Sequence, residues 1–175
     1  GYVACALGWA CWKTYCGRPE TDETRMDAMT VLGNGLYAAK NYVDTLSVRE
    51  ADLSMRRRLG APEEDMLVVQ SNLAITYENL GRLDEALRLT RDVYTGFLKL
   101  FGEEHQQTLL AANNYASSLN RLERFGEAKS LLRKTVPVTR RILGESNVGT
   151  LRVRSVYAEA LYRDDGATFD DLCEA

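Results

Sequence analysis

Residues 66–102 read MLVVQSNLAITYENLGRLDEALRLTRDVYTGFLKLFG, and this stretch decides the fold because it recurs along the chain. Its last residue, Gly102, lies 42 residues after Gly60 and 42 residues before Gly144, and a large apolar residue precedes each of the three. A fixed period of this length is typical of stacked supersecondary repeats. Such repeats bury their apolar faces on their neighbours and leave an extended surface, so the sequence favours partner binding over catalysis.

Each repeat is predicted to contain two helices. Apolar residues from Met66 to Leu80 recur at spacings of three and four, which is typical of an amphipathic helix. Gly81 is expected to end this helix, because glycine enters the left-handed backbone region without steric cost. The carboxylates of Asp84 and Glu85 suit the positive end of the next helix, which the apolar pattern extends to Gly102.

The period divides the chain into repeats that together form a single domain. Because the sequence begins at Gly1 rather than Met, we expect this domain to be a fragment or processed product of a longer chain. About seven helices are expected in total. The expected divisions are residues 1–17 as the second helix of a partial preceding repeat, 24–60 as repeat 1, 66–102 as repeat 2, 108–144 as repeat 3 and 150–175 as a partial repeat 4.

Residues 72–86 resemble the signature of the tetratricopeptide repeat family. The match consists of Asn72-Leu73-Ala74, Tyr77 and Gly81-Arg82-Leu83-Asp84-Glu85-Ala86. The 42-residue period and the loops that follow Phe101 and Leu143 resemble the kinesin light chain variety, whose repeats end in a Leu-Gly loop. HEAT and armadillo repeats have similar periods, but this residue order favours tetratricopeptide repeats. The resemblance implies an all-α, right-handed solenoid of stacked helix-turn-helix repeats.

In proteins that this chain resembles, the first helix of each repeat lines a concave groove that binds peptides. The corresponding positions here are Asn34, Tyr37, Asn72, Asn79, Asn113, Asn114, Ser117, Asn120, Arg121, Arg152, Ser155 and Arg163. An amide can both donate to and accept from a peptide backbone, and arginine can bind a carboxylate through paired donors. The resemblance therefore implies an extended or short helical, acidic peptide as the ligand. The other interpretation is that the asparagines cap or bridge neighbouring helices.

Composition excludes several other classes of function. The net charge of −3 and the pI of about 5.3 disfavour a nucleic-acid-binding surface. The sequence contains no apolar run long enough to insert directly in a membrane. The four cysteines form no C-x-x-C pair and are interpreted as buried structural thiols in a reducing compartment, so we expect a cytoplasmic protein.

Catalytic and cofactor motifs are not expected. His105 is the only histidine, so no His/Cys or Ser/His triad and no metal cluster can be argued, and the chain is predicted not to be an enzyme. Gly33-Asn34-Gly35 lies inside a predicted helix and lacks the flanking strand and lysine of a phosphate-binding loop. Gly33 is instead interpreted as a small packing residue. We therefore expect neither a metal nor a cofactor.

A second hypothesis is a structural scaffold subunit that is held in a larger assembly through its outer helices and residues 1–16. Trp9 and Trp12 lie in this apolar N-terminal segment, and tryptophans near a chain end suggest burial against a missing helix or a partner. A third possibility is that the repeats hold a domain that lies outside this chain.

Overall fold

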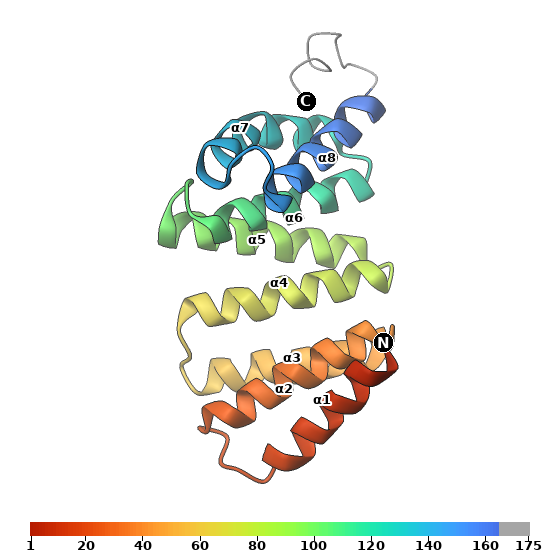
Figure 1. The fold of residues 1–175 in the computed structure, drawn as a ribbon, viewed down its shortest axis with the longest axis vertical. Coiled ribbons are helices and arrows are strands. Elements are labelled where there is room, and N and C mark those ends of the chain that lie inside the picture. Colours follow the sequence, from red (N-terminus) through yellow and green to blue (C-terminus); the bar gives the residue numbers. More distant parts are fainter. Residues whose placement is uncertain (165–175) are drawn as a thin grey trace. The chain divides into compact units, whose positions relative to one another are not determined.

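The computed structural model describes residues 1–164, which form eight α-helices (Figure 1). These residues divide into two compact units, residues 1–82 and residues 83–164. The first unit contains α1 (Tyr2–Tyr15), α2 (Glu23–Ala38), α3 (Tyr42–Arg58) and α4 (Glu63–Asn79). The second unit contains α5 (Leu83–Phe101), α6 (Gln106–Arg121), α7 (Phe125–Leu143) and α8 (Val148–Arg163). The all-α fold class is confirmed.

Residues 1–164 form eight helices rather than about seven, because the final partial repeat contributes a complete helix, α8. In the first unit, each helix packs against the next along the chain. In the second unit the same holds, and α6 also packs against α8. The division between the units separates the two helices of the expected repeat 66–102. The last part of the expected fourth repeat, residues 165–175, lies outside the described residues.

The turns after α2, α4 and α6, the first helices of repeats 1 to 3, each pass through a left-handed residue. Gly81 has a φ of 75°, and the residues 41 positions earlier and 42 positions later, Lys40 and Glu123, have φ values of 62° and 58°. In all three turns the following residue donates its amide N–H to a carbonyl five residues back, which satisfies a helix-end acceptor. These bonds join Asn41 N to Leu36 O at 3.0 Å, Arg82 N to Tyr77 O at 2.9 Å and Arg124 N to Leu119 O at 2.9 Å. The expected helix end at Gly81 is confirmed.

Small residues set the close approach of α1 and α2. A Cβ atom at Gly35 would overlap the carbonyl oxygen of Ala4 and lie 3.2 Å from the Cα of Cys5. By contrast, a Cβ at Gly33 would lie 3.5 Å from Arg49 Cγ, which is ordinary van der Waals contact. Gly33 therefore has room for a small side chain, which agrees with its interpretation as a small packing residue. At Gly35 an added Cβ would instead meet the backbone of α1, so this position requires glycine.

The core of the second unit is built from all of its last three helices. Its largest fully buried side chain is Tyr157 of α8, which is 1% exposed. It packs with Ala116 and Leu119 of α6 and with Leu132 and Val136 of α7. Because α6, α7 and α8 share this core, the positions of the α6 and α8 side chains relative to one another are fixed by packing.

His105 has a structural role at the start of α6. Its Nδ1 atom accepts a hydrogen bond from the backbone N–H of Gln107 at 3.3 Å, which caps the helix. Its ring also stacks on Phe101, with 4.3 Å between ring centroids. Cys5, Cys11 and Cys16 are free thiols. They were expected to be buried but are half-buried, because α1 packs against α2 and its other faces are less covered.

The close approach of α1 and α2 predicts opposite effects for two neighbouring glycines. Gly35→Ala is expected to lower the free energy of unfolding by about 2 kcal/mol, because the added methyl group forces the helices apart. Gly33→Ala is the matched control and should raise stability by up to about 1 kcal/mol through helix propensity. Urea unfolding can be followed by tryptophan fluorescence, because both tryptophans, Trp9 and Trp12, lie in α1. Equal midpoints for the two variants would contradict the proposed packing.

Candidate functional site

The predicted residues of the first unit lie on α2 and α4 and are partly joined to one another. Asn79 donates its side-chain amide to the phenol oxygen of Tyr37 at 3.1 Å and to the carbonyl of Ile75 at 2.8 Å. Asn34 accepts a hydrogen bond through Oδ1 from Arg49 at 3.1 Å. The structure therefore brings Asn34, Tyr37, Asn72 and Asn79 to one surface, and it uses some of their polar atoms to bridge helices.

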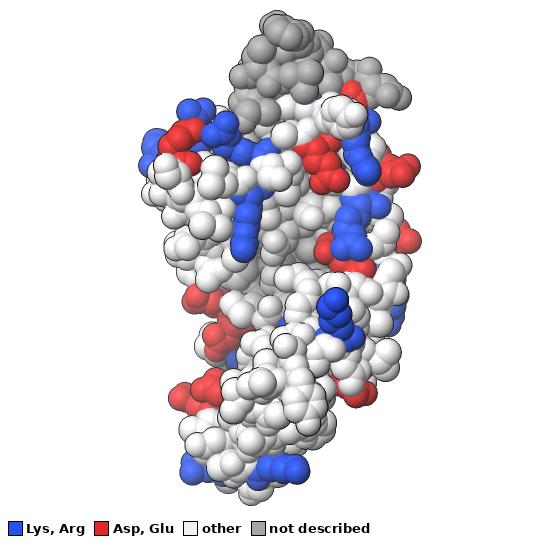
Figure 2. Space-filling view, turned by 45° about the vertical axis from the view of Figure 1, so that its right-hand side comes forward, with Lys and Arg blue, Asp and Glu red and all other residues white. Residues whose placement is uncertain are grey.

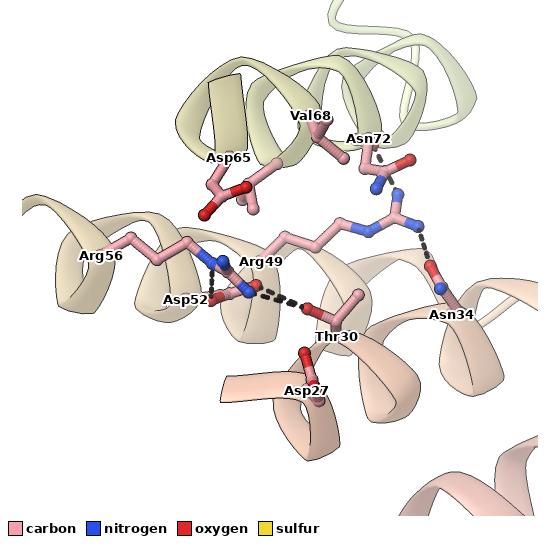
Figure 3. Close-up of a pocket in the computed structure, with 10 residues that line it drawn as sticks. Asp27, Thr30, Asn34, Arg49, Asp52, Arg56, Asp65, Val68 and Asn72 are labelled. Atoms are coloured by element: carbon pink, nitrogen blue, oxygen red, sulfur yellow. Dashed lines mark hydrogen bonds and ion pairs between the residues drawn. The ribbon is translucent and has the colours of Figure 1, made fainter. Parts of the chain in front are cut away.

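Arg49 of α3 is the central polar residue of this surface. Its side chain runs between α2 and α4 and donates to the Asn72 carbonyl and the Asn34 amide oxygen (Figure 3). It also donates to the Thr76 hydroxyl. The guanidinium also lies over the Tyr37 ring, 5.1 Å from its centroid. Arg49 is only 7% exposed, and this burial lowers the pKa of its guanidinium to about 10. It forms no ion pair within the part of the chain that the structure describes.

A second buried polar group lies one turn further along α3. Asp52 is 3% exposed and forms an ion pair with Arg56 at 2.8 Å. Thr30 of α2 donates to Asp52 at 3.2 Å and accepts from Arg56 at 3.3 Å (Figure 3). The carboxylate charge of Asp52 is thus compensated locally by Arg56.

These side chains surround a cavity of about 160 Å³ in the first unit, which we call the α2–α4 groove. Its walls come from α2 and α4, and its floor comes from α3. The lining residues are Asp27, Thr30, Asn34, Arg49, Asp52, Arg56, Asp65, Val68, Val69 and Asn72. Two of the predicted residues, Asn34 and Asn72, line this groove.

Sequence reasoning missed Arg49, although the repeat pattern contained a signal. Arg49 aligns with Thr90, 41 residues later, and with Leu132, a further 42 residues later. Thr90 and Leu132 are both buried, at 3% and 0% exposure. A charged residue at a position that the other repeats keep in the core indicates a specialised polar interior.

In the second unit, one of the predicted residues is buried between helices, and the others are half-buried or exposed. Asn120 is 2% exposed and joins α6 to α8, since its side-chain amide donates to the Val156 carbonyl at 3.0 Å and to Glu159 at 3.4 Å. This arrangement matches the helix-bridging interpretation of the asparagines. Arg163 lies over the Phe125 ring, with 5.8 Å to the centroid. The other predicted residues are half-buried at Asn113, Asn114 and Ser117 and exposed at Arg121, Arg152 and Ser155.

Asn113 and Arg152 meet at a cavity of about 270 Å³, which we call the α6–α8 cavity. The cavity is lined by Gln106, Leu109, Leu110, Asn113, Thr139, Leu143, Asn147, Val148, Gly149, Arg152 and Val153. Arg152 is the only charged residue among them. The Oδ1 atom of Asn113 is buried and accepts no hydrogen bond from the described residues. The cavity therefore combines an apolar lining, one cation and one unused acceptor.

Residues 1–164 contain neither a metal-binding cluster nor a membrane-spanning helix. No group of three or more His, Cys, Asp or Glu residues in this range could hold a metal ion. None of the helices formed by these residues is both long and apolar enough to cross a membrane.

Comparisons with known proteins agree with the observed helix pairs. The tetratricopeptide repeat family model matches residues 65–140 of this chain. No curated protein sequence matches the chain. One similar crystal structure shows the nearly identical TPR-like repeats of a Podosopora anserina protein assigned as a kinesin light chain. Its sequence is 20% identical to that of this chain. It has a TM-score of 0.75, and the match covers 97% of this chain and 78% of that chain.

Two further solved structures are similar in fold. BtubC (BKLC) from P. vanneervenii is 16% identical with a TM-score of 0.70, over 98% of this chain and 78% of that one. The apo form of RapI is 13% identical with a TM-score of 0.69, over 93% of this chain and 63% of that one. At these identities the likeness concerns the fold. The chain therefore has the all-α helical-repeat fold of these structures.

The bridging role of Arg49 predicts that lysine cannot replace it. Arg49→Lys is expected to lower the free energy of unfolding by about 2 kcal/mol, because a single ammonium cannot reach the acceptors on both α2 and α4. Arg57→Lys on the exposed face of the same helix is the control and should change stability by less than about 0.5 kcal/mol. Urea unfolding followed by tryptophan fluorescence measures the free energy of unfolding of both variants. An Arg49→Lys midpoint equal to that of the control would show that the bridge contributes nothing.

Proposed function

We propose that the chain is a peptide-recognition module and that the α6–α8 cavity binds an extended or short helical, acidic segment of a partner protein. The observation that carries this proposal is the unused acceptor of Asn113 beside the only charge of the cavity, Arg152. A buried carbonyl oxygen without a donor is costly, and a backbone N–H of a bound peptide would satisfy it. The Arg152 guanidinium would then bind a carboxylate of the same segment.

The apolar lining supports a mixed ligand rather than a purely charged one. Leu109 is buried, whereas Leu110 and Val148 are 46% and 63% exposed beside the cavity. Exposed apolar side chains at a concave site lose contact with water when a ligand side chain covers them. We therefore propose an acidic residue next to an apolar one as the minimal feature of the ligand.

Arg121 and Arg163 lie in the last turns of α6 and α8, on the same helices as Asn113 and Arg152. Both are exposed, so they add positive potential where a long acidic segment would leave the cavity. Asn120 is left out of the proposed contact surface because it is buried between α6 and α8.

This proposal is tested by selecting peptides from a random library displayed on phage. We expect the selected sequences to contain Asp or Glu beside an apolar residue. Arg152→Ala should weaken their binding about tenfold, because it removes a charge-assisted contact. Asn113→Ala should weaken binding without lowering stability, because its oxygen has no partner to lose.

The matched control for charge is Arg88→Ala on α5, which is exposed and does not line the cavity. It should leave the affinity of the selected peptides unchanged. Selected sequences without acidic residues, or equal losses for Arg88→Ala and Arg152→Ala, would contradict the proposed site. Circular dichroism of each variant separates loss of contact from loss of fold.

One observation favours the scaffold alternative. In α1, Tyr2, Val3, Leu7 and Trp9 are 88%, 69%, 63% and 43% exposed, so this helix presents apolar side chains that a partner could cover. Residues 1–16 would then hold the chain in a larger assembly. This alternative predicts that a partner covers α1 and leaves α6 and α8 accessible.

A further inference from the structure

The side of α1 that faces away from α2 is exposed. Gly8 is the buried residue of α1, and a Cβ atom added there would lie 3.0 Å from the Cα of Leu32 in α2. Because each residue turns a helix by about 100°, the opposite side carries the residues at spacings of three and four from Val3. All of them are exposed, and none is charged. We call this set the outer stripe of α1, and its members are Val3, Ala6, Leu7, Ala10 and Thr14.

The repeat pattern places α1 among the second helices of the repeats. The glycine that follows α1, Gly17, aligns with the glycines that follow α5 and α7. In this alignment Gly8 corresponds to Val93 and Thr135, which are 2% and 7% exposed. The buried side of α1 is therefore equivalent to the buried sides of α5 and α7, and the outer stripe is equivalent to their outer sides.

Two positions of the outer stripe are apolar where the other repeats are polar. Val3 and Leu7 are 69% and 63% exposed. The residues that align with them on α5 and α7 are also exposed but polar, and they are Arg88, Asp92, Ser130 and Lys134. In Figure 2, a broad white area accordingly covers the lower part of the first unit, where Figure 1 places α1. An apolar stripe on a side that the other repeats leave to solvent indicates an interaction surface.

We propose that the outer stripe of α1 packs antiparallel on the same stripe of a second copy of this chain. The stripe is complementary to itself, because its large apolar residues lie in the first half of α1 and its small ones in the second half. A two-fold axis at the middle of α1 places Leu7 on the partner's Ala10 and Val3 on the partner's Thr14. Each large side chain thereby meets a small one, as an isologous interface requires.

The charges of α1 select the same arrangement. Lys13 is the single charged residue of this helix. Antiparallel packing separates the two Lys13 residues by about 14 Å along the helix axis, whereas parallel packing would place them side by side. A charged side chain of an unrelated partner would lose its water on this stripe without gaining a counter-charge. A second copy brings no such charge, so it fits both the shape and the polarity of the stripe.

The size of the surface predicts a weak dimer. The stripe belongs to one helix of 14 residues, which is about 21 Å long. Such a contact covers less than the area of about 800 Å² per partner that stable interfaces bury. We therefore expect a dissociation constant on the order of tens of micromolar and a dimer that depends on chain concentration.

Sedimentation velocity across a concentration series that spans this dissociation constant tests the proposal. The weight-average mass should rise with concentration from 19.6 kDa towards twice that value. Leu7→Lys should raise the dissociation constant about 100-fold, because each dimer loses two Leu7 contacts and must bury two charges.

The matched control is Val43→Lys on α3. Val43 is 65% exposed, close to the 63% of Leu7, and it lies outside the outer stripe. The control replaces an exposed apolar residue of the same unit with the same charge, so it should leave the dissociation constant unchanged. Circular dichroism of each variant separates loss of association from loss of fold.

Two further variants test the antiparallel arrangement. Ala10→Leu should weaken the dimer, because two large side chains then meet at the position of Leu7. Combining Leu7→Ala with Ala10→Leu exchanges the large and small residues and should restore the dimer.

A mass that stays monomeric at all concentrations, or equal effects of Leu7→Lys and Val43→Lys, would overturn the proposal. A stronger dimer with Ala10→Leu alone would overturn the antiparallel arrangement. The proposal gives the scaffold alternative a specific partner and is independent of the α6–α8 cavity. Its failure would therefore leave the acidic-peptide proposal standing, because that proposal depends on residues of the second unit.

Discussion

The left-handed turn that follows α2, α4 and α6 is the constraint on which the helix pairs depend. Lys40, Gly81 and Glu123 occupy this position in three successive repeats, and only one of them is glycine. A residue with a Cβ atom in this region costs about 1 kcal/mol or more, so the packing of the helices must compensate for it. The turn directs the chain back along the preceding helix, and as a result the first helices present their outer faces as the walls of the candidate sites.

The same helix-pair plan holds two different interiors. In the first unit, Arg49 replaces an apolar or small buried residue and joins α2, α3 and α4 through hydrogen bonds. In the second unit, Leu132 at the matching position belongs to an apolar core with Tyr157. In the first unit, the α2–α4 groove has a polar floor and acidic walls. In the second unit, the α6–α8 cavity has an apolar lining and one charged residue, Arg152. Divergence at a single core position therefore accompanies a change in the charge of the surface above it.

Much of the fold could be predicted from the sequence because it rests on period and local turn chemistry. The spacing of Gly60, Gly102 and Gly144 and the helix end at Gly81 are local signals, and all four have positive φ. The site was harder to predict, because a polar side chain has several possible partners. Asn120 became a bridge between α6 and α8 only because Val156 lies within reach, and the role of Arg49 depends on three helices. Likewise, Gly35 rather than Gly33 is the tight position, which only the approach of α1 reveals.

The central claim is that an acidic partner is recognised at the α6–α8 cavity and not through α1. Hydrogen–deuterium exchange of the chain with and without an acidic peptide selected from a random library tests it most directly. The account predicts slower exchange in residues 106–121 and 148–163, with α1 unchanged. Protection confined to residues 1–16, or to α5 and α7, would contradict the account and favour a scaffold that is held through its outer surfaces.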